Sequence, residues 1–229
     1  MKSTEAHAAL LLLGLATFTT SEAAAALGLG RNAAAKTLQR LAETGHLVRL
    51  VRGRWSIPER TQPFMLPEAL TAPRPSYVSL YSALHHHGMI EQIPEVIYAA
   101  TLAPTRTVET PLGTVSLHQL APSFFFGYET QAVTGVKIAV PEKALLDVLY
   151  LRPARSRRFR ALPEFELPKR FSPRRAREMV SEIGASRRRN FVARELERAL
   201  SRAQAAYTKL SRCNLKHDPC GEIPGVVVH

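Results

Sequence analysis

Residues 31–43 combine side chains suited to contacting nucleic acid with a stripe of apolar side chains. The polar members, which share the exposed side of the predicted helix, are Asn32, Lys36, Gln39 and Arg40. The apolar members, spaced i, i+4 and i+7, are Ala34, Leu38 and Leu41. Amide and guanidinium groups can hydrogen-bond to base edges, and a lysine can neutralise a phosphate. The pattern therefore predicts a helix that buries one face and offers the other to a polyanion.

The elements expected around this helix follow the order of a winged helix–turn–helix. A helix over about residues 3–16 and a short helix over 22–27 precede it, and Gly28-Leu29-Gly30 provides the turn. Residues 46–57 then indicate a β-hairpin with a basic tip. We predict that residues 1–60 form a winged helix–turn–helix DNA-binding domain; a small helical module that binds protein is the alternative. The predicted DNA-binding residues are Arg31, Asn32, Lys36, Thr37, Gln39, Arg40, Arg52 and Arg54.

Three consecutive histidines, His85, His86 and His87, raise the question of a metal site. Successive residues of a helix point about 100° apart, so these rings fan around the axis and cannot converge on one ion. A helical zinc site needs histidines four residues apart, as in the HExxH pattern. We therefore predict no metal site here, and we expect His87 to pack or hydrogen-bond at the edge of the core.

The middle of the chain mixes helical and strand patterns. Residues 61–75 contain four prolines and are predicted to be a linker, and residues 76–162 are predicted to form an α/β domain with antiparallel hairpins. The expected strands cover residues 96–101, 107–110, 114–118, 124–126 and 136–140. The expected helices lie between Ser79 and Gly88 and over residues 141–150.

Acidic side chains in this middle region leave a nuclease as an alternative hypothesis. They are Glu109, Glu129, Glu142 and Asp147. Their spacing is not the D…ExK pattern of many nucleases, and no GxSxG, phosphate-binding loop or GxGxxG motif occurs. We predict no catalytic residue and no cofactor. An enzyme stays open as an alternative because catalytic sites also assemble from residues far apart in sequence.

Three stretches of the chain resemble one protein family. They are YVSLYSALHHHGMIEQIPEVIYAAT, TRTVETPLGTVSLHQLAPSFFFGYE and GVKIAVPEKALLDVLYL. The chain resembles the AbiEi-like antitoxins of type IV toxin–antitoxin systems, which act in abortive infection, over about residues 5–200. The resemblance implies a bacterial transcriptional repressor of its own operon. It also implies that the protein counteracts a neighbouring nucleotidyltransferase-like toxin, and this does not require stable contact between the two proteins. A regulator unrelated to a toxin, and an adaptor whose winged helix contacts the toxin, are the alternatives.

One residue departs from the family pattern. Family members often carry threonine directly before the PEKALLD helix, where it can cap the helix, but Val140 stands here. We expect the missing cap to cost about 1 kcal/mol of stability. Inverted repeats are expected in the operator if two copies bind adjacent half-sites.

Residues 163–212 are predicted to form a basic helical segment, with one helix after Ser172 and another over about 187–210. Its candidate contacts with nucleic acid or a partner are Arg174, Arg175, Arg187, Arg188, Arg189 and Arg194. The alternative is a solvated helical face. Residues 213–229 are expected to be a tail, either disordered or a truncated end.

Charge supports this division into modules. The net charge is +12, with 8 basic and 4 acidic residues in 1–60, 4 and 7 in 61–150, and 19 and 8 in 151–229. Basic ends on an acidic middle predict a polyanionic partner.

Cys213 and Cys220 are expected to be reduced thiols in the cytoplasm. The apolar run HAALLLLGLATF is too short to span a membrane, which takes about 20 residues. The expected fold class is α+β.

Overall fold

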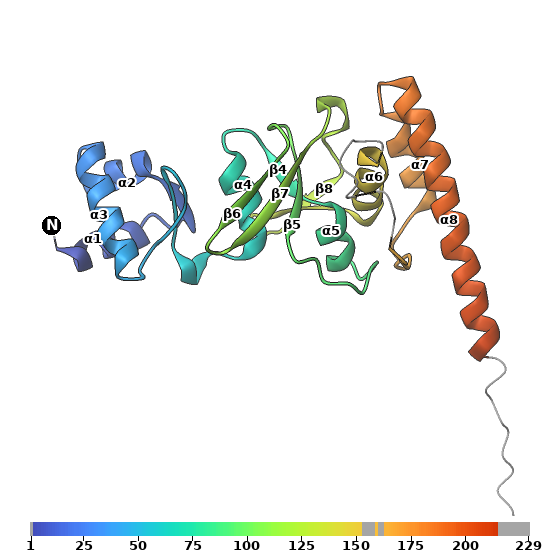
Figure 1. Cartoon of the computed structure of the whole chain (residues 1–229), viewed down its shortest axis with the longest axis horizontal. Helices are drawn as coiled ribbons and strands as arrows, with labels where there is room; N and C mark the ends of the chain where they lie inside the picture. Colours follow the sequence, from blue (N-terminus) through green and yellow to red (C-terminus); the bar gives the residue numbers. More distant parts are fainter. Residues whose placement is uncertain (1, 153–158, 160–162, 215–229) are drawn as a thin grey trace, which may run out of the picture.

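The structure is a computed structural model that describes residues 2–152, 159 and 163–214, with side chains described as far as residue 205. It is a mixed α+β fold that contains helices α1–α8 and two β-sheets. Figure 1 shows an elongated molecule with the N-terminal elements at one end, the larger sheet in the middle and helices α7 and α8 at the other end.

The N-terminal elements form three helices and a small antiparallel sheet with the order β1-β3-β2. They are α1 (Ser3–Leu11), β1 (Thr17–Thr19), α2 (Thr20–Leu27), α3 (Arg31–Glu43), β2 (Val48–Val51) and β3 (Arg54–Ser56). Their core contains Leu10, Phe18, Leu38, Leu41 and Trp55. The bounds expected for the helix over 31–43 are confirmed.

Two expectations for this region are corrected. Helix α1 ends at Leu11 rather than near residue 16, because a turn in which Gly14 has a φ of +68° follows it and the chain then enters β1, which pairs with β3. Helix α2 starts at Thr20 rather than at Glu22, and it is capped by Thr19. The Thr19 hydroxyl accepts from the Glu22 amide and the Glu22 carboxylate accepts from the Thr19 amide, which is a capping box.

The middle domain is a six-stranded mixed sheet with the order β6-β7-β5-β4-β9-β8. Its elements are β4 (Ser76–Val78), α5 (Leu80–His86), β5 (Ile97–Thr101), β6 (Arg106–Thr110), β7 (Gly113–Gln119), β8 (Tyr128–Thr130), β9 (Lys137–Ala139) and α6 (Pro141–Leu151). The predicted hairpin is confirmed as the antiparallel pair β6–β7. Residues 124–126 are not a strand, because Pro122 begins a 3-10 turn, η3 (Pro122–Phe124), that buries the Phe124 ring.

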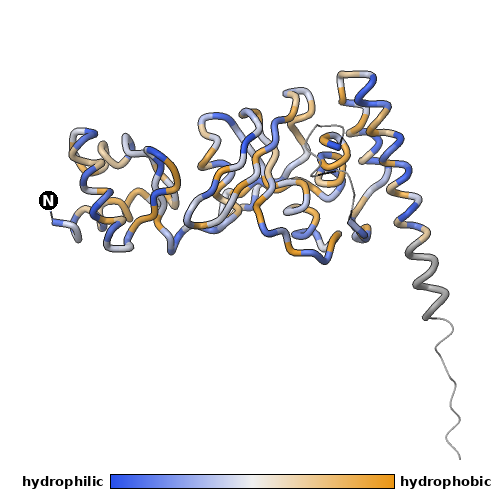
Figure 2. The backbone as a smooth tube through the Cα atoms, in the orientation of Figure 1, coloured by the Kyte–Doolittle hydropathy of each residue, from blue (hydrophilic) through white to orange (hydrophobic). Residues whose placement is uncertain are grey.

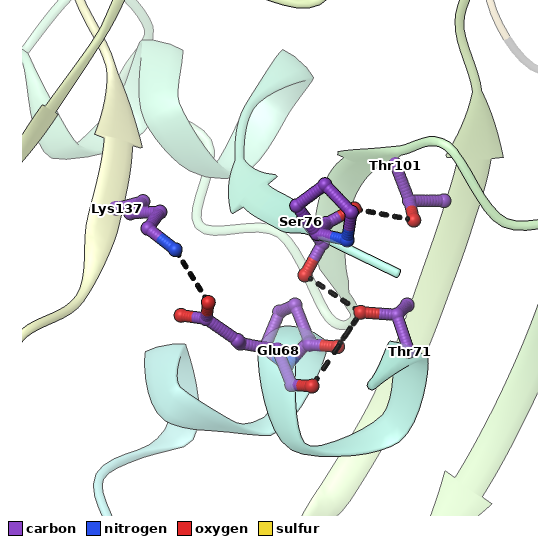
Figure 3. A network of polar contacts seen from close by, with 7 residues as sticks. Glu68, Thr71, Ser76, Thr101 and Lys137 are labelled. Atoms are coloured by element: carbon purple, nitrogen blue, oxygen red, sulfur yellow. Dashed lines mark hydrogen bonds and ion pairs between the residues drawn. The ribbon is translucent and has the colours of Figure 1, made fainter. Parts of the chain in front are cut away.

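The predicted linker is largely folded, which corrects that expectation. It forms the 3-10 turn η2 (Pro63–Met65) and helix α4 (Leu66–Thr71), and another 3-10 turn, η1 (Pro58–Arg60), directly precedes it. Proline suits the first turn of a helix, so this proline-rich stretch starts turns instead of preventing them. Figure 3 shows how α4 is joined to the sheet: the Thr71 hydroxyl lies 3.1 Å from the Ser76 hydroxyl, and the Lys137 ammonium lies 2.5 Å from the Glu68 carboxylate.

Successive side chains of the central strands point to opposite faces of the sheet. One face presents Ile97, Ala99, Val115 and Leu117, which pack with α4 and with Leu50 of β2. The other face presents Tyr98 and Ala100, which pack with α5 and α6. The β2–β3 hairpin therefore contributes to the core of the middle domain as well as to its own module.

Helices α7 (Pro173–Ser181) and α8 (Ser186–Asn214) pack on α6 at the far end of the molecule. The Ser172 hydroxyl accepts from the Arg175 amide, as expected of a cap. Figure 2 shows hydrophilic and hydrophobic residues alternating along α8 up to the described limit of its side chains. The expected tail lies outside the described residues except for 213 and 214, which end α8. Within the described ranges, no helix has the length and apolar character needed to cross a bilayer.

Candidate nucleic-acid interface

A groove runs between helix α3 and the β2–β3 hairpin, and most of the predicted contact residues line it. From α3 it is lined by Arg31, Asn32, Lys36, Gln39 and Arg40, all of which are exposed. From the hairpin it is lined by Arg49 and Arg52. The structure thus brings the polar face of α3 and the basic turn of the hairpin to one groove.

Burial fixes the orientation of α3. Ala34, Leu38 and Leu41 are fully buried, so the opposite side of the helix must face the groove. Thr37, the remaining predicted residue of α3, also lines the groove but is nearly buried. Its side chain is only 5% exposed and its hydroxyl donates to the Ala33 carbonyl. Threonine hydroxyls often bond to the preceding turn of their own helix in this way.

The hairpin contributes a residue that the prediction missed. Arg49 is exposed on β2, directly opposite Trp55 on β3, and its guanidinium lies 5.8 Å from the centre of the indole ring. The indole N–H donates to the Thr20 hydroxyl at 2.9 Å, so Trp55 joins the hairpin to α2 and is buried. The alternation of Val48, Arg49 and Leu50 could have placed Arg49 on the outer face.

Arg54 is not among the residues that line this groove, although it shares a neighbouring hollow with Arg52. It follows the turn at Gly53 and lines the hollows on the α4 side of the hairpin. Its charge helps to hold the pKa of Glu22 below the ordinary value, although the hydrogen bond from the Thr19 amide is the larger cause. Arg31 lines both the groove and one of these hollows.

The C-terminal arginines are less available than the sequence suggests. Arg188 donates to the Tyr150 carbonyl and lies over the Tyr150 ring, and Arg189 donates to the Ile183 carbonyl at 3.3 Å. Both side chains are half-buried and have structural contacts, and their role in binding nucleic acid or a partner stays a prediction. Arg174 pairs with Glu178, although both side chains are mostly exposed. The exposed members of the predicted set are Arg174, Arg175, Arg187 and Arg194.

The histidine run has a structural role at one position. The Nε2 of His87 lies 2.6 Å from the Ala139 carbonyl, and its Nδ1 faces the Arg170 guanidinium. The expected hydrogen bond at the core edge is confirmed. The described residues contain no cluster of three or more acidic, histidine or cysteine side chains able to hold a metal ion.

The acidic residues of the nuclease hypothesis are not brought together. Glu109 on β6 and Glu129 on β8 lie on opposite edge strands of the sheet. Five strand spacings of about 4.8 Å separate these edges by roughly 24 Å. Glu142 is buried and accepts from the Ser172 amide at 2.7 Å, and Asp147 is enclosed within a different set of contacts.

Those contacts form a buried polar cluster that the sequence analysis did not predict. Lys143 pairs with Asp147 one turn along α6, and both side chains are fully buried. The Tyr77 hydroxyl donates to Asp147 at 3.0 Å and the Ser79 hydroxyl at 2.6 Å. The Lys143 ammonium also lies 3.7 Å from the centre of the Phe124 ring. Burial is the main cause that raises the pKa of Asp147 and lowers that of Lys143.

The fold and the groove define an α+β protein with a basic surface at one end. No family model matches the chain, and no curated protein matches it. Among solved structures, it is similar to the crystal structure of the RV2827C protein from Mycobacterium tuberculosis, with a TM-score of 0.54 and 17% identity. The match covers 83% of this chain and 74% of that chain. At this identity the likeness concerns the fold alone.

Proposed function

We propose that the chain is a sequence-specific DNA-binding regulator whose N-terminal module is a winged helix–turn–helix. The observation that carries the proposal is the groove between α3 and the β2–β3 hairpin. In this assignment α3 enters the major groove, Asn32, Gln39 and Arg40 face base edges, and Lys36 and Arg52 contact phosphates. The order α1–β1–α2–α3–β2–β3, with β1 completing the sheet beside the hairpin, is compatible with that class.

A binding experiment with DNA from upstream of the gene tests the assignment. We expect Lys36→Ala plus Arg40→Ala to weaken specific binding at least tenfold, because contacts of this kind contribute about 1–3 kcal/mol each. The matched control is Arg74→Ala plus Lys169→Ala, which removes two exposed basic side chains outside the groove and leaves the affinity within a factor of two or so. Operator binding by the first variant at wild-type affinity excludes α3 as the recognition helix.

We further propose that the regulator is a cytoplasmic antitoxin of a type IV toxin–antitoxin system. This part rests on the resemblance of the segments from Tyr77 to Leu151 to the AbiEi-like family. Its expected partners are an operator, with inverted repeats, and a nucleotidyltransferase-like toxin encoded beside it. Co-expression with the adjacent gene tests it: the chain should restore growth that the neighbour alone prevents. A neighbour of another class, or a toxin left active, favours a regulator unrelated to toxins.

A further inference from the structure

A cleft lies between the N-terminal module and the middle domain, and it shares no lining residue with the α3 groove. One wall comes from the α1–β1 connection, from Arg54 on β3 and from Arg60 in η1. The other walls come from η2, α4, β4 and the β8–β9 loop. Two segments about 120 residues apart in sequence, around Leu15 and around Val133, therefore line the same cleft.

The apolar lining of this cleft is unusually open to solvent. The exposed large hydrophobic side chains of the described chain are Leu12, Leu15, Ile93 and Val133. Two of these four, Leu15 at 42% and Val133 at 97% exposure, line the cleft, together with the partly buried Phe64 and Met65. Apolar side chains from two modules that face one hollow are typical of a ligand site at a domain boundary.

The charged side chains around the cleft indicate whether a bound ligand would be an anion or a cation. Its lining carries three basic side chains, Arg54, Arg60 and Lys137, and one acidic side chain, Glu68. Lys137 is paired with Glu68 at 2.5 Å (Figure 3), which leaves the two arginines in excess. Arg60 uses one N–H to donate to the Leu11 carbonyl at 2.8 Å, and a guanidinium has five donors. The cleft therefore favours an anion.

We propose that this cleft binds a small aromatic anion, such as an aromatic carboxylate or sulfonate, whose ring contacts Leu15, Phe64 and Val133 while its charge faces Arg54 and Arg60. Because Arg54 directly follows the hairpin turn that borders the α3 groove, a bound ligand fixes the hairpin relative to the middle domain. Ligand binding therefore changes the affinity of the groove for DNA, and DNA changes the affinity for the ligand by the same factor. This coupling rests on the proposed DNA-binding function, whereas the ligand site itself does not.

The test uses the full chain and anilinonaphthalene sulfonate, an aromatic anion that fluoresces when it enters an apolar site. We expect one saturable site in the wild type. Val133→Asp should weaken binding roughly fivefold or more, because it removes apolar contact and adds a like charge. Val133→Leu should retain binding. The matched control is Ile93→Asp, which changes another exposed hydrophobic side chain, outside the cleft, and should also leave binding unchanged.

The outcomes are separable. Absence of saturable binding, or equal losses in Val133→Asp and Ile93→Asp, overturns the ligand site. If the site is confirmed, operator affinity is measured with and without saturating probe, and a change of about fivefold or more is expected for coupled sites. An unchanged operator affinity overturns the coupling and leaves the site in place. A chain that binds the probe but no operator DNA refutes the proposed function instead.

Discussion

At the scale of single residues, His87 is the clearest case in which protonation should matter. The ring donates from Nε2 to the Ala139 carbonyl, so the neutral form presents an acceptor at Nδ1 to the Arg170 guanidinium. Protonation would put an N–H against that cation. The other charged or titratable groups that influence His87 are His86, which also lowers its pKa, and Glu129, which raises it. The net direction is a lowered pKa, caused first by burial.

A folded-state pKa below the unfolded value means that the unfolded chain binds the proton more readily. The stabilisation by His87 is therefore complete above about pH 6.5, the ordinary histidine pKa, and is lost as the pH falls through the folded-state value. Urea unfolding at several pH values between neutral and mildly acidic should show this loss. His87→Gln and Arg170→Gln should each reduce the loss of stability at low pH. Part of the pH dependence should remain in both variants, because the pKa of His86 is also lowered. An identical pH dependence in all three proteins contradicts the assignment.

At the scale of elements, the start of α6 shows a helix whose capping position lacks a capping side chain. Val140 is the N-cap, has extended backbone angles and makes no side-chain cap, and its amide donates to the Gly127 carbonyl at 3.0 Å. Val140→Thr should have a free energy of unfolding about 0.5–1 kcal/mol above that of Val140→Ala, because its hydroxyl can accept from a first-turn amide and so offsets the loss of a buried methyl group. Chemical denaturation measures this. Val140→Ala is the control and should destabilise, since it only removes buried methyl groups; equal destabilisation by both variants refutes the capping argument.

The elements also show what could be predicted from sequence. Helix α3 follows from its 3.6-residue periodicity, and the β6–β7 hairpin from strand propensity around a glycine turn. Strand β1, three residues long, has no periodic signal and depends on pairing with β3. Helix α4 in the 61–75 segment could not be predicted, because proline content indicates a break without showing whether a buried helix begins there. The Lys143–Asp147 pair could have been noticed from its i, i+4 spacing, but not its burial, which depends on partners about 70 residues away in sequence.

Some features of the candidate contact surface could also be predicted from sequence, and others could not. Periodicity placed Lys36, Gln39 and Arg40 on one exposed face, and the structure brings them together with Arg52. It could not show that Arg54 lines the cleft beside α4, or that Arg188 and Arg189 donate to carbonyls, because these contacts depend on packing between elements. At the scale of the molecule, helix α3 lies at one end of the long axis and helices α7 and α8 at the other (Figure 1), so the arginines of α7 and α8 are far from the α3 groove. These arginines and the groove do not form one continuous surface.

The whole molecule is joined by the hairpin, because Leu50 on β2 is 3% exposed and packs with Leu70 and Leu117 of the middle domain. We therefore expect the N-terminal module and the sheet to unfold together. Trp55, the chain's single tryptophan, reports on the hairpin through its fluorescence, whereas circular dichroism reports on all helices. The two urea transitions should coincide in the wild type.

Leu50→Asp should separate these transitions, with the tryptophan transition moving to lower urea, because an unpaired carboxylate cannot remain buried against the sheet. Leu47→Ala is the matched control: it removes a buried side chain from the core of the N-terminal module alone and should lower stability by about 2–5 kcal/mol while the two transitions stay together. Separate transitions already in the wild type would show that the junction does not couple the modules.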